Sequence, residues 1–173
     1  MKVSMKSNTI PRIMIIVSMI AGISFIDQLT KFYARLLLDP PESISFLDGV
    51  LTLALHKNPG AFLSFGAGFS DDLRFIAFAV GGGLIILVGL YYLLRTANLS
   101  RGMTIALSFV VGGAIGNEID RLIFHGYVTD FLFLSYKSIH TGIFNVADMA
   151  IMLGVGMFFI EAWRTSQHPV VTT

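Results

Sequence analysis

Four apolar segments, each long enough to cross a lipid bilayer, constrain the fold of this chain more than any other feature of its sequence. A helix of about 20 apolar residues spans the hydrocarbon core and satisfies its own backbone hydrogen bonds there. Of the 173 residues, 54% are apolar and only 13% are charged, and the mean hydropathy is +0.75. We therefore predict an α-helical integral membrane protein with four transmembrane helices, as a single membrane-embedded domain over residues 1–173. The helices are predicted at approximately residues 12–32, 74–94, 103–122 and 143–163.

The first apolar segment follows a basic stretch and so imitates a secretory signal peptide. No small-x-small cleavage motif comes after it, and the helical pattern continues through Asp27, Gln28 and Lys31. We interpret this segment as a retained transmembrane helix.

Basic residues near the helix ends predict the orientation, because lysine and arginine concentrate in cytoplasmic loops. Both termini are then cytoplasmic, and the outer loops 33–73 and 123–142 face the other side. The residues that carry this prediction are Lys2, Lys6, Arg12, Arg95, Arg101 and Arg164.

The first outer loop contains two alternating apolar runs, residues 44–47 and 50–56, separated by Asp48 and Gly49. An Asp-Gly pair suits the two-residue type I′ turn of a β-hairpin. We predict a small extracytoplasmic β-sheet element on the membrane surface, and an ordered but inert loop is the alternative. Asp39 and Asp71, also in this loop, are expected to be nearly silent when replaced by asparagine.

Polar residues on three of the predicted helices lie at one depth. Counting from the cytoplasmic basic residues at about 1.5 Å per residue places Asp27, Asn117, Asp120 and Asp148 roughly 22 to 28 Å across a core of about 30 Å. Charged groups inside a membrane are costly and are commonly functional. We therefore predict a polar site near the outer face of the membrane.

On the third helix, Asn117, Asp120 and Arg121 share a face, whereas Glu118 points roughly 100° away from it. Arg121 is predicted to pair with a nearby carboxylate, since an unpaired charge is costly at this depth. The alternative is a helix end that simply reaches the lipid headgroups. Gly116, in the same segment, permits close helix packing without any catalytic role.

Structural explanations exist for two further pairs. Asn145 and Asp148 have the spacing of a helix N-cap with an acid three residues later. Asp27 and Lys31 are four residues apart on a helix, and Lys31 can alternatively extend its amine to the membrane surface. Asp130, between apolar neighbours, has the weakest structural explanation of these acids.

Two neighbouring carboxyl groups that share one proton can hydrolyse a peptide bond, because one activates water while the other polarises the carbonyl. Asp130 and Asp148 are the best such pair. The chain has no cysteine and only four scattered histidines, so neither a thiol nucleophile nor a metal cofactor is expected. The net charge of +1 gives no reason to expect a nucleic-acid partner.

The sequence resembles the lipoprotein signal peptidases, the bacterial signal peptidase II family of intramembrane aspartic proteases. Five blocks in order over nearly the whole chain carry the resemblance. They are Asp27-Gln28-Leu29-Thr30-Lys31, Asn58-Pro59-Gly60-Ala61-Phe62, Gly116-Asn117-Glu118-Ile119-Asp120-Arg121, Val128-Thr129-Asp130-Phe131 and Phe144-Asn145-Val146-Ala147-Asp148.

The resemblance implies that Asp130 and Asp148 are catalytic, with no cofactor. It implies a prolipoprotein substrate that carries diacylglycerol on its lipobox cysteine and is cut before that cysteine. The enzyme would be a monomer among the lipids of the bacterial cytoplasmic (inner) membrane, active near its extracytoplasmic face. The candidate substrate-binding or supporting residues are Asp27, Lys31, Asn58, Gly60, Ala61, Gly116, Asn117, Asp120, Arg121, Phe144, Asn145 and Ala147.

The chain departs from the family pattern at two places. Phe62 directly follows Ala61, one residue earlier than in the usual Asn-x-Gly-Ala-Ala-Phe motif, and Glu118 stands where an apolar residue is expected. The intramembrane acids also suit two rival functions. A small proton-coupled carrier or channel subunit would need acids at several depths or a broken helix pair at the midplane. A purely structural subunit would leave the five polar blocks unexplained.

Overall fold

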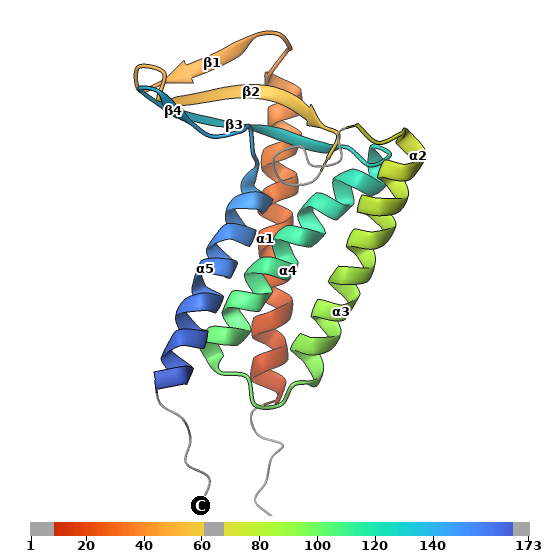
Figure 1. Cartoon of the computed structure of the whole chain (residues 1–173), viewed down its shortest axis with the longest axis vertical. Helices are drawn as coiled ribbons and strands as arrows, with labels where there is room; N and C mark the ends of the chain where they lie inside the picture. The colour runs from red at the N-terminus through yellow and green to blue at the C-terminus, as the bar shows by residue number, and fades with distance from the viewer. Residues whose placement is uncertain (1–8, 61–67, 168–173) are drawn as a thin grey trace, which may run out of the picture.

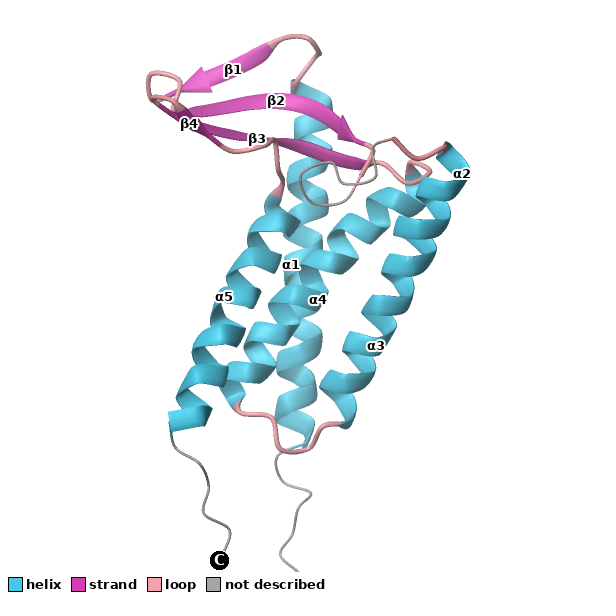
Figure 2. Ribbon diagram, in the orientation of Figure 1, coloured by secondary structure: helices cyan, strands magenta, loops and turns pink. Residues whose placement is uncertain are grey.

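The structure is a computed structural model that describes residues 9–60 and 68–167 of the chain. Within these residues it has four helical segments long and apolar enough to cross a membrane, together with a small antiparallel sheet at one end of the bundle (Figures 1 and 2). The predicted fold class is confirmed. The helical segments are α1 (Thr9–Leu37), α2 (Asp71–Arg74) continued by the π-helix η2 (Phe75–Val80) and α3 (Gly81–Arg95), α4 (Arg101–Ile123) and α5 (Val146–Gln167).

The last helix begins later than the predicted residue 143. Its N-cap is Asn145, whose side-chain oxygen accepts a hydrogen bond from the backbone N–H of Asp148 at 2.9 Å, as capping side chains do. Phe144 lies before the cap in extended backbone and forms a β-bridge with Leu132. An apolar pattern alone therefore placed the helix start about three residues too early.

Helix α4 lies at the centre of the bundle and packs against α1, α3 and α5 (Figure 1). Its glycines face the neighbouring helices so closely that no side chain would fit. A Cβ atom at Gly113 would lie 2.5 Å from the carbonyl oxygen of Ala147, and one at Gly116 would lie 2.7 Å from Asp27 Oδ2. These contacts bring the polar residues of α1, α4 and α5 to one level.

The sheet contains β1 (Ser43–Phe46), β2 (Leu51–Asn58), β3 (Val128–Tyr136) and β4 (Ile139–His140), in that order and all antiparallel. Its β2–β3 part packs on the end of α1, where Leu53 and Leu55 contact a cluster that contains Ala34 and Phe131. The predicted sheet element is thus present. The loop alternative for residues 44–56 is wrong, because these residues pair as strands.

The hairpin turn differs from the predicted two-residue Asp48-Gly49 turn. Phe46 pairs with Leu51, so the loop has four residues, 47–50. Leu47 and Asp48 hold φ angles of 53° and 54°, and Gly49 has a φ of 85°. The left-handed pair therefore begins one residue earlier than an Asp-Gly turn would require.

Strand β3 lies where the sequence suggested only the outer loop 123–142. It pairs with β2 so that His56 lies opposite Asp130 and Asn58 opposite Val128. The paired residues of β2 lie 70 to 83 positions earlier in the chain, so no local pattern reveals the pairing. This strand carries Asp130 to the end of the helical bundle.

The expectation that Asp71→Asn is nearly silent stays a prediction, but the structure shows a contact of Asp71 that the sequence did not indicate. Asp71 is not an isolated loop acid, because its carboxylate accepts a hydrogen bond from Arg74 Nη1 at 2.5 Å. Arg74 is 5% exposed, whereas the Asp71 side chain is 79% exposed, so solvent weakens the ion pair but Asp71→Asn still changes a partner of a buried arginine. Asp39 makes no such contact among the described residues and stays the better neutral position.

Candidate active site

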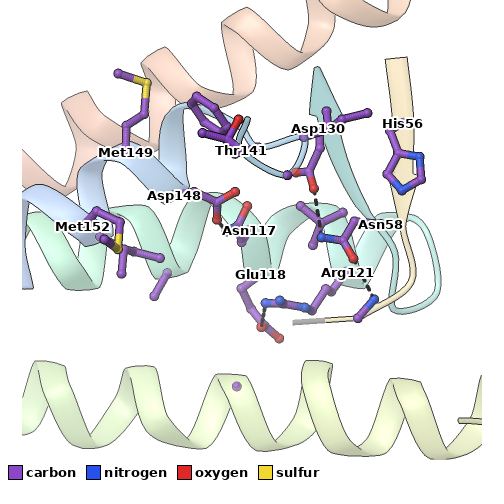
Figure 3. Close-up of a pocket in the computed structure, with 18 of the residues that line it drawn as sticks. His56, Asn58, Asn117, Glu118, Arg121, Asp130, Thr141, Asp148, Met149 and Met152 are labelled. Atoms are coloured by element: carbon purple, nitrogen blue, oxygen red, sulfur yellow. Dashed lines mark hydrogen bonds and ion pairs between the residues drawn. The ribbon is translucent and has the colours of Figure 1, made fainter. Parts of the chain in front are cut away.

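A cavity of about 860 Å³ opens between the sheet and helices α3, α4 and α5. Asp130 and Asp148 both line it, and Figure 3 shows their side chains on the same side of the cavity as Asn117 and Asn58. Its remaining wall is largely aliphatic. This wall includes Ile85, Ile86, Ala114, Ile151 and Met152.

Asn145 connects the two aspartates. Its side-chain amide donates to Asp130 Oδ1 at 2.6 Å, and its backbone N–H donates to Asp148 Oδ2 at 3.2 Å. The second contact and the 2.9 Å bond from the backbone N–H of Asp148 to Asn145 Oδ1 form a reciprocal cap of α5. The residue that caps α5 therefore also hydrogen-bonds to both aspartates.

Two further amides hold the aspartates. Asn117 Nδ2 donates to Asp148 Oδ1 at 2.8 Å, and Asn58 Nδ2 donates to Asp130 Oδ2 at 2.9 Å. The backbone N–H of Gly60 in turn donates to Asn58 Oδ1 at 2.9 Å. Each carboxylate is thus oriented by donors from two different parts of the chain.

Lys31 is the centre of a buried polar network behind the aspartates. Its amine lies 2.8 Å from Asp27 Oδ2, 3.4 Å from Asp120 Oδ2 and 2.9 Å from Asn117 Oδ1. The residue is 0% exposed, so the alternative in which Lys31 reaches the membrane surface is wrong.

The acids of this network also bind backbone groups. Asp27 Oδ1 accepts from the backbone N–H of Ala147 at 2.9 Å, and Asp120 Oδ2 accepts from that of Thr129 at 2.8 Å. Ala147 and Thr129 directly precede Asp148 and Asp130. Charge-assisted bonds of this kind are strong, so they fix the chain next to both candidate catalytic acids.

The charges around the cavity are divided unevenly. Among the described residues, the nearby cations pair with other acids: Lys31 with Asp27 and Asp120, Arg35 with Asp120, and Arg121 with Glu118. Asp130 and Asp148 instead receive hydrogen bonds from neutral amides. Burial, followed by the negative charge of Asp148, raises the pKa of Asp130 from 3.8 to about 7. A pair of carboxyl groups in this setting keeps one proton near neutral pH.

Arg121 pairs with a carboxylate as predicted, but the partner is Glu118, at 3.7 Å. Glu118 was expected to point away from the polar face. It lines the same cavity as the two aspartates, on the side of α3 (Figure 3). The reason is that α3 offers glycine rather than a side chain there, at Gly82.

Most of the predicted site residues meet in this region. Phe144 and Gly60 line the cavity, Ala147 is buried, and Gly116 contacts Asp27. Ala61 and Phe62 lie outside the described residues.

The site residues that were not predicted include polar residues of the cavity wall and two residues of the supporting network. His56 and Thr141 line the cavity. Gln28 donates to Asp120 Oδ1 at 3.2 Å, and Thr129 accepts from Arg35 Nη1 at 2.9 Å. Gln28 and Thr129 belong to the quoted sequence blocks, which was the available signal. Within residues 9–60 and 68–167, no group of three or more histidine, aspartate or glutamate side chains is arranged to hold a metal ion.

Comparison with known proteins gives consistent matches. The family model described as signal peptidase (SPase) II matches residues 19–164. The lipoprotein signal peptidase of Gloeobacter violaceus is 39% identical over 143 residues, which cover 83% of this chain and 78% of that protein. That of Halalkalibacterium halodurans is 37% identical over 143 residues, with 82% and 87% covered.

Solved structures also resemble this fold. A bacterial membrane enzyme determined by the in meso method at 2.3 Å resolution has a TM-score of 0.78 and 24% identity, covering 91% of this chain and 93% of its own. A second one, at 1.9 Å resolution, has a TM-score of 0.72 and 25% identity, with 85% and 91% covered. These likenesses describe the arrangement of helices and sheet.

Proposed function

The chain belongs to the signal peptidase II family, and we propose that it uses Asp130 and Asp148 as a catalytic aspartic pair. Its family makes it a multi-pass protease of the bacterial inner membrane that removes signal peptides from prolipoproteins. The carrier alternative is not favoured, since Glu118, Asp130 and Asp148 line one cavity and the Lys31 network with Asp27 and Asp120 lies directly behind it, rather than at several depths. The observation that best supports the aspartic mechanism is that Asn145 donates hydrogen bonds to the carboxyl groups of both Asp130 and Asp148.

In the proposed reaction, the ionised member of the pair takes a proton from water while the oxygen of that water attacks the scissile carbonyl carbon. The protonated member hydrogen-bonds to the carbonyl oxygen and transfers its proton as the tetrahedral intermediate forms. The intermediate collapses when the C–N bond breaks: the amine nitrogen receives a proton from one member of the pair, and a hydroxyl of the intermediate returns its proton to the other member as the carbonyl re-forms. One water is consumed, and the pair returns to its singly protonated state.

The proton belongs to the pair rather than to one residue, because the two groups titrate together. The raised pKa of Asp130, about 7, supplies a carboxyl that still holds a proton near neutral pH. Asn58, Asn117 and Asn145 keep the pair in place with neutral donors, so no fixed cation locks both groups in the ionised form.

The substrate is proposed to be a prolipoprotein with diacylglycerol on its lipobox cysteine, cut just before that cysteine. The aliphatic side of the cavity, formed by residues such as Ile85, Ile86 and Met152, suits acyl chains. The protein is proposed to act as a monomer. The sheet end of the bundle is proposed to face away from the cytoplasm. Arg12, Arg101 and Arg164 belong to the start of α1, the start of α4 and the end of α5, and these helix ends lie opposite the sheet (Figure 1).

The test uses purified protein and a lipobox peptide made with and without the diacylglyceryl group. Cleavage of the lipidated peptide before the cysteine, and loss of that cleavage in Asp148→Asn, are expected. Asp39→Asn, an exposed acid outside the cavity, is the matched control. Cleavage at an unchanged rate by Asp148→Asn would refute the aspartic mechanism, whereas no cleavage by the parent protein would refute the substrate assignment.

A further inference from the structure

Glu118 and Arg121 differ from the other charged residues around the cavity because they are nearly buried and poorly hydrogen-bonded. Glu118 is 7% exposed, and the Arg121 side chain is 14% exposed. Glu118 Oε2 and Arg121 Nε are both buried without a hydrogen-bond partner among the described residues. The closest approach of the two groups is 3.7 Å, longer than a hydrogen bond.

The contrast with Lys31 makes the pair unusual. Lys31 is fully buried and makes three close polar contacts, so its charge is fully satisfied. A buried polar atom without a partner costs free energy, and native proteins keep few of them. A charged pair that lines a binding cavity in this condition is suited to groups that arrive with the ligand.

The two side chains need different ligand groups. A carboxylate only accepts hydrogen bonds, and a guanidinium only donates them. A ligand that satisfies both must present a donor and an acceptor side by side. The N–H and C=O of one residue in an extended peptide have this arrangement, since both point to the same side of the chain.

An acyl ester of the lipid satisfies only half of this requirement. Its oxygens can accept from Arg121, but they have no hydrogen to donate to Glu118 and would be repelled by its carboxylate. The wall formed by Glu118 and Arg121 therefore favours peptide over lipid ester. Its position supports this, because Glu118 follows Asn117, which holds Asp148 at 2.8 Å, so the wall adjoins the candidate catalytic pair (Figure 3).

We propose that Glu118 is a specificity-determining residue that, together with Arg121, binds the N–H and C=O of one residue of the substrate peptide and directs the lipid ester to another part of the cavity. This inference rests on the proposed function, because it assumes a lipidated peptide substrate in this cavity. The substrate N–H donates to the Glu118 carboxylate, and the substrate C=O accepts from the Arg121 guanidinium.

The first experiment scans the substrate. In a set of lipidated lipobox peptides, one backbone N–H at a time is replaced by an ester oxygen, and the scissile amide is left intact. One replacement should lower kcat/KM by roughly 10- to 100-fold with the parent protein, as expected for a lost hydrogen bond to a charged group. With Glu118→Leu, the same replacement should have no further effect, and KM for the all-amide peptide should be raised. Equal sensitivity of both proteins at every position would overturn the proposal.

A second pair of variants moves the carboxylate without removing it. A Cβ at Gly82 would lie 2.8 Å from Glu118 Oε2, whereas one at Gly83 would lie 3.7 Å from Glu118 Oε1, an ordinary contact. Gly82→Ala should therefore raise KM severalfold and reduce the ester effect, while Gly83→Ala should resemble the parent protein. These variants keep the test decisive if Glu118→Leu does not fold, because alanine favours helix more than glycine does. Equal KM values for the two alanine variants would count against the proposal.

The outcomes distinguish a failure of the proposed Glu118 role from a failure of the proposed peptidase function. If the parent protein does not cleave the all-amide lipidated peptide, the proposed function fails. If it cleaves that peptide but shows no ester-sensitive position that depends on Glu118, only the role of Glu118 fails.

Discussion

Replacing Asp130 with asparagine should make the stability of this protein much less dependent on pH while abolishing its activity. Asp130 is 1% exposed, and burial together with the charge of Asp148 raises its pKa from 3.8 to about 7. Above pH 3.8 the unfolded chain releases this proton, while the folded protein keeps it until about pH 7. Asp130 therefore lowers the free energy of unfolding progressively as the pH rises through this window. Asparagine has no such titration.

The magnitude follows from the two pKa values. One pKa unit corresponds to about 1.4 kcal/mol, so the destabilisation is about 2 kcal/mol at pH 5 and at most about 4 kcal/mol at pH 8. The amides of Asn58 and Asn145 both donate to Asp130, and an asparagine there loses part of this acceptance at a cost of about 1–3 kcal/mol. That cost is the same at both pH values. Between pH 5 and pH 8 the stability of Asp130→Asn relative to the parent should therefore rise by about 2–3 kcal/mol.

The assay is thermal unfolding of both proteins in one detergent at several pH values, with cleavage of a lipidated peptide measured in parallel. The relative increase corresponds to roughly 5 to 10 °C in Tm for a chain of this size. Asp39→Asn, at an exposed position, should give a constant difference near zero. A stability difference for Asp130→Asn that is the same at pH 5 and pH 8 would refute the raised pKa, and retained cleavage would refute the catalytic role.

Three further changes test the supporting structure. Arg121→Lys keeps the positive charge but loses the planar fork of donors, so kcat/KM should fall by about tenfold or more, and full activity at normal expression would contradict a directional role. Lys31→Met leaves three buried acceptors without their cation and should lower stability by about 3–5 kcal/mol in detergent unfolding, whereas exposed Lys137→Met should not; equal stability of the two would argue against the network. Asp48→Cys should react with an impermeant thiol reagent in spheroplasts and Asn98→Cys should not, and the reverse labelling would invert the proposed topology.

The four transmembrane helices could be predicted from the sequence, because each apolar segment is long and its pattern does not depend on distant residues. The β3 strand was missed for the opposite reason, since Val128–Tyr136 becomes a strand only when β2 is beside it. The hairpin loop was mispredicted because the pairing of Phe46 with Leu51 decides the loop length, and the pairing is a tertiary property.

The polar residues were predictable as a group but not as partners. Helical counting correctly placed Asp27, Asn117, Asp120 and Asp148 at one level. It could not show that Lys31 is enclosed rather than extended to the surface, because that depends on three other segments packing around it.

Side-chain roles outside the matched pattern were the least accessible from sequence. The sequence led us to expect an apolar residue at position 118, pointing away from the polar face of α4. Gly82 of α3, which faces Glu118, explains how the cavity accommodates an acid there. Asp39 and Asp71 looked equivalent as loop acids, yet only Asp71 binds a buried arginine.

The two candidate catalytic acids come from different sides of one boundary, Asp130 from the surface sheet and Asp148 from the first turn of α5. Asn145 joins them at the point where the sheet ends and the helix begins. The height of the reacting bond above the far end of the bundle is therefore set by α5, where Asp148 and Arg164 are separated by roughly 24 Å of helix. If cleavage takes place at these acids as proposed, a signal peptide that runs parallel to α5 needs about 16 residues of helix to bring its cleavage point from the far end of the bundle to the acids. On the proposed function, the length of α5 therefore sets a minimum length for the helical part of the substrate.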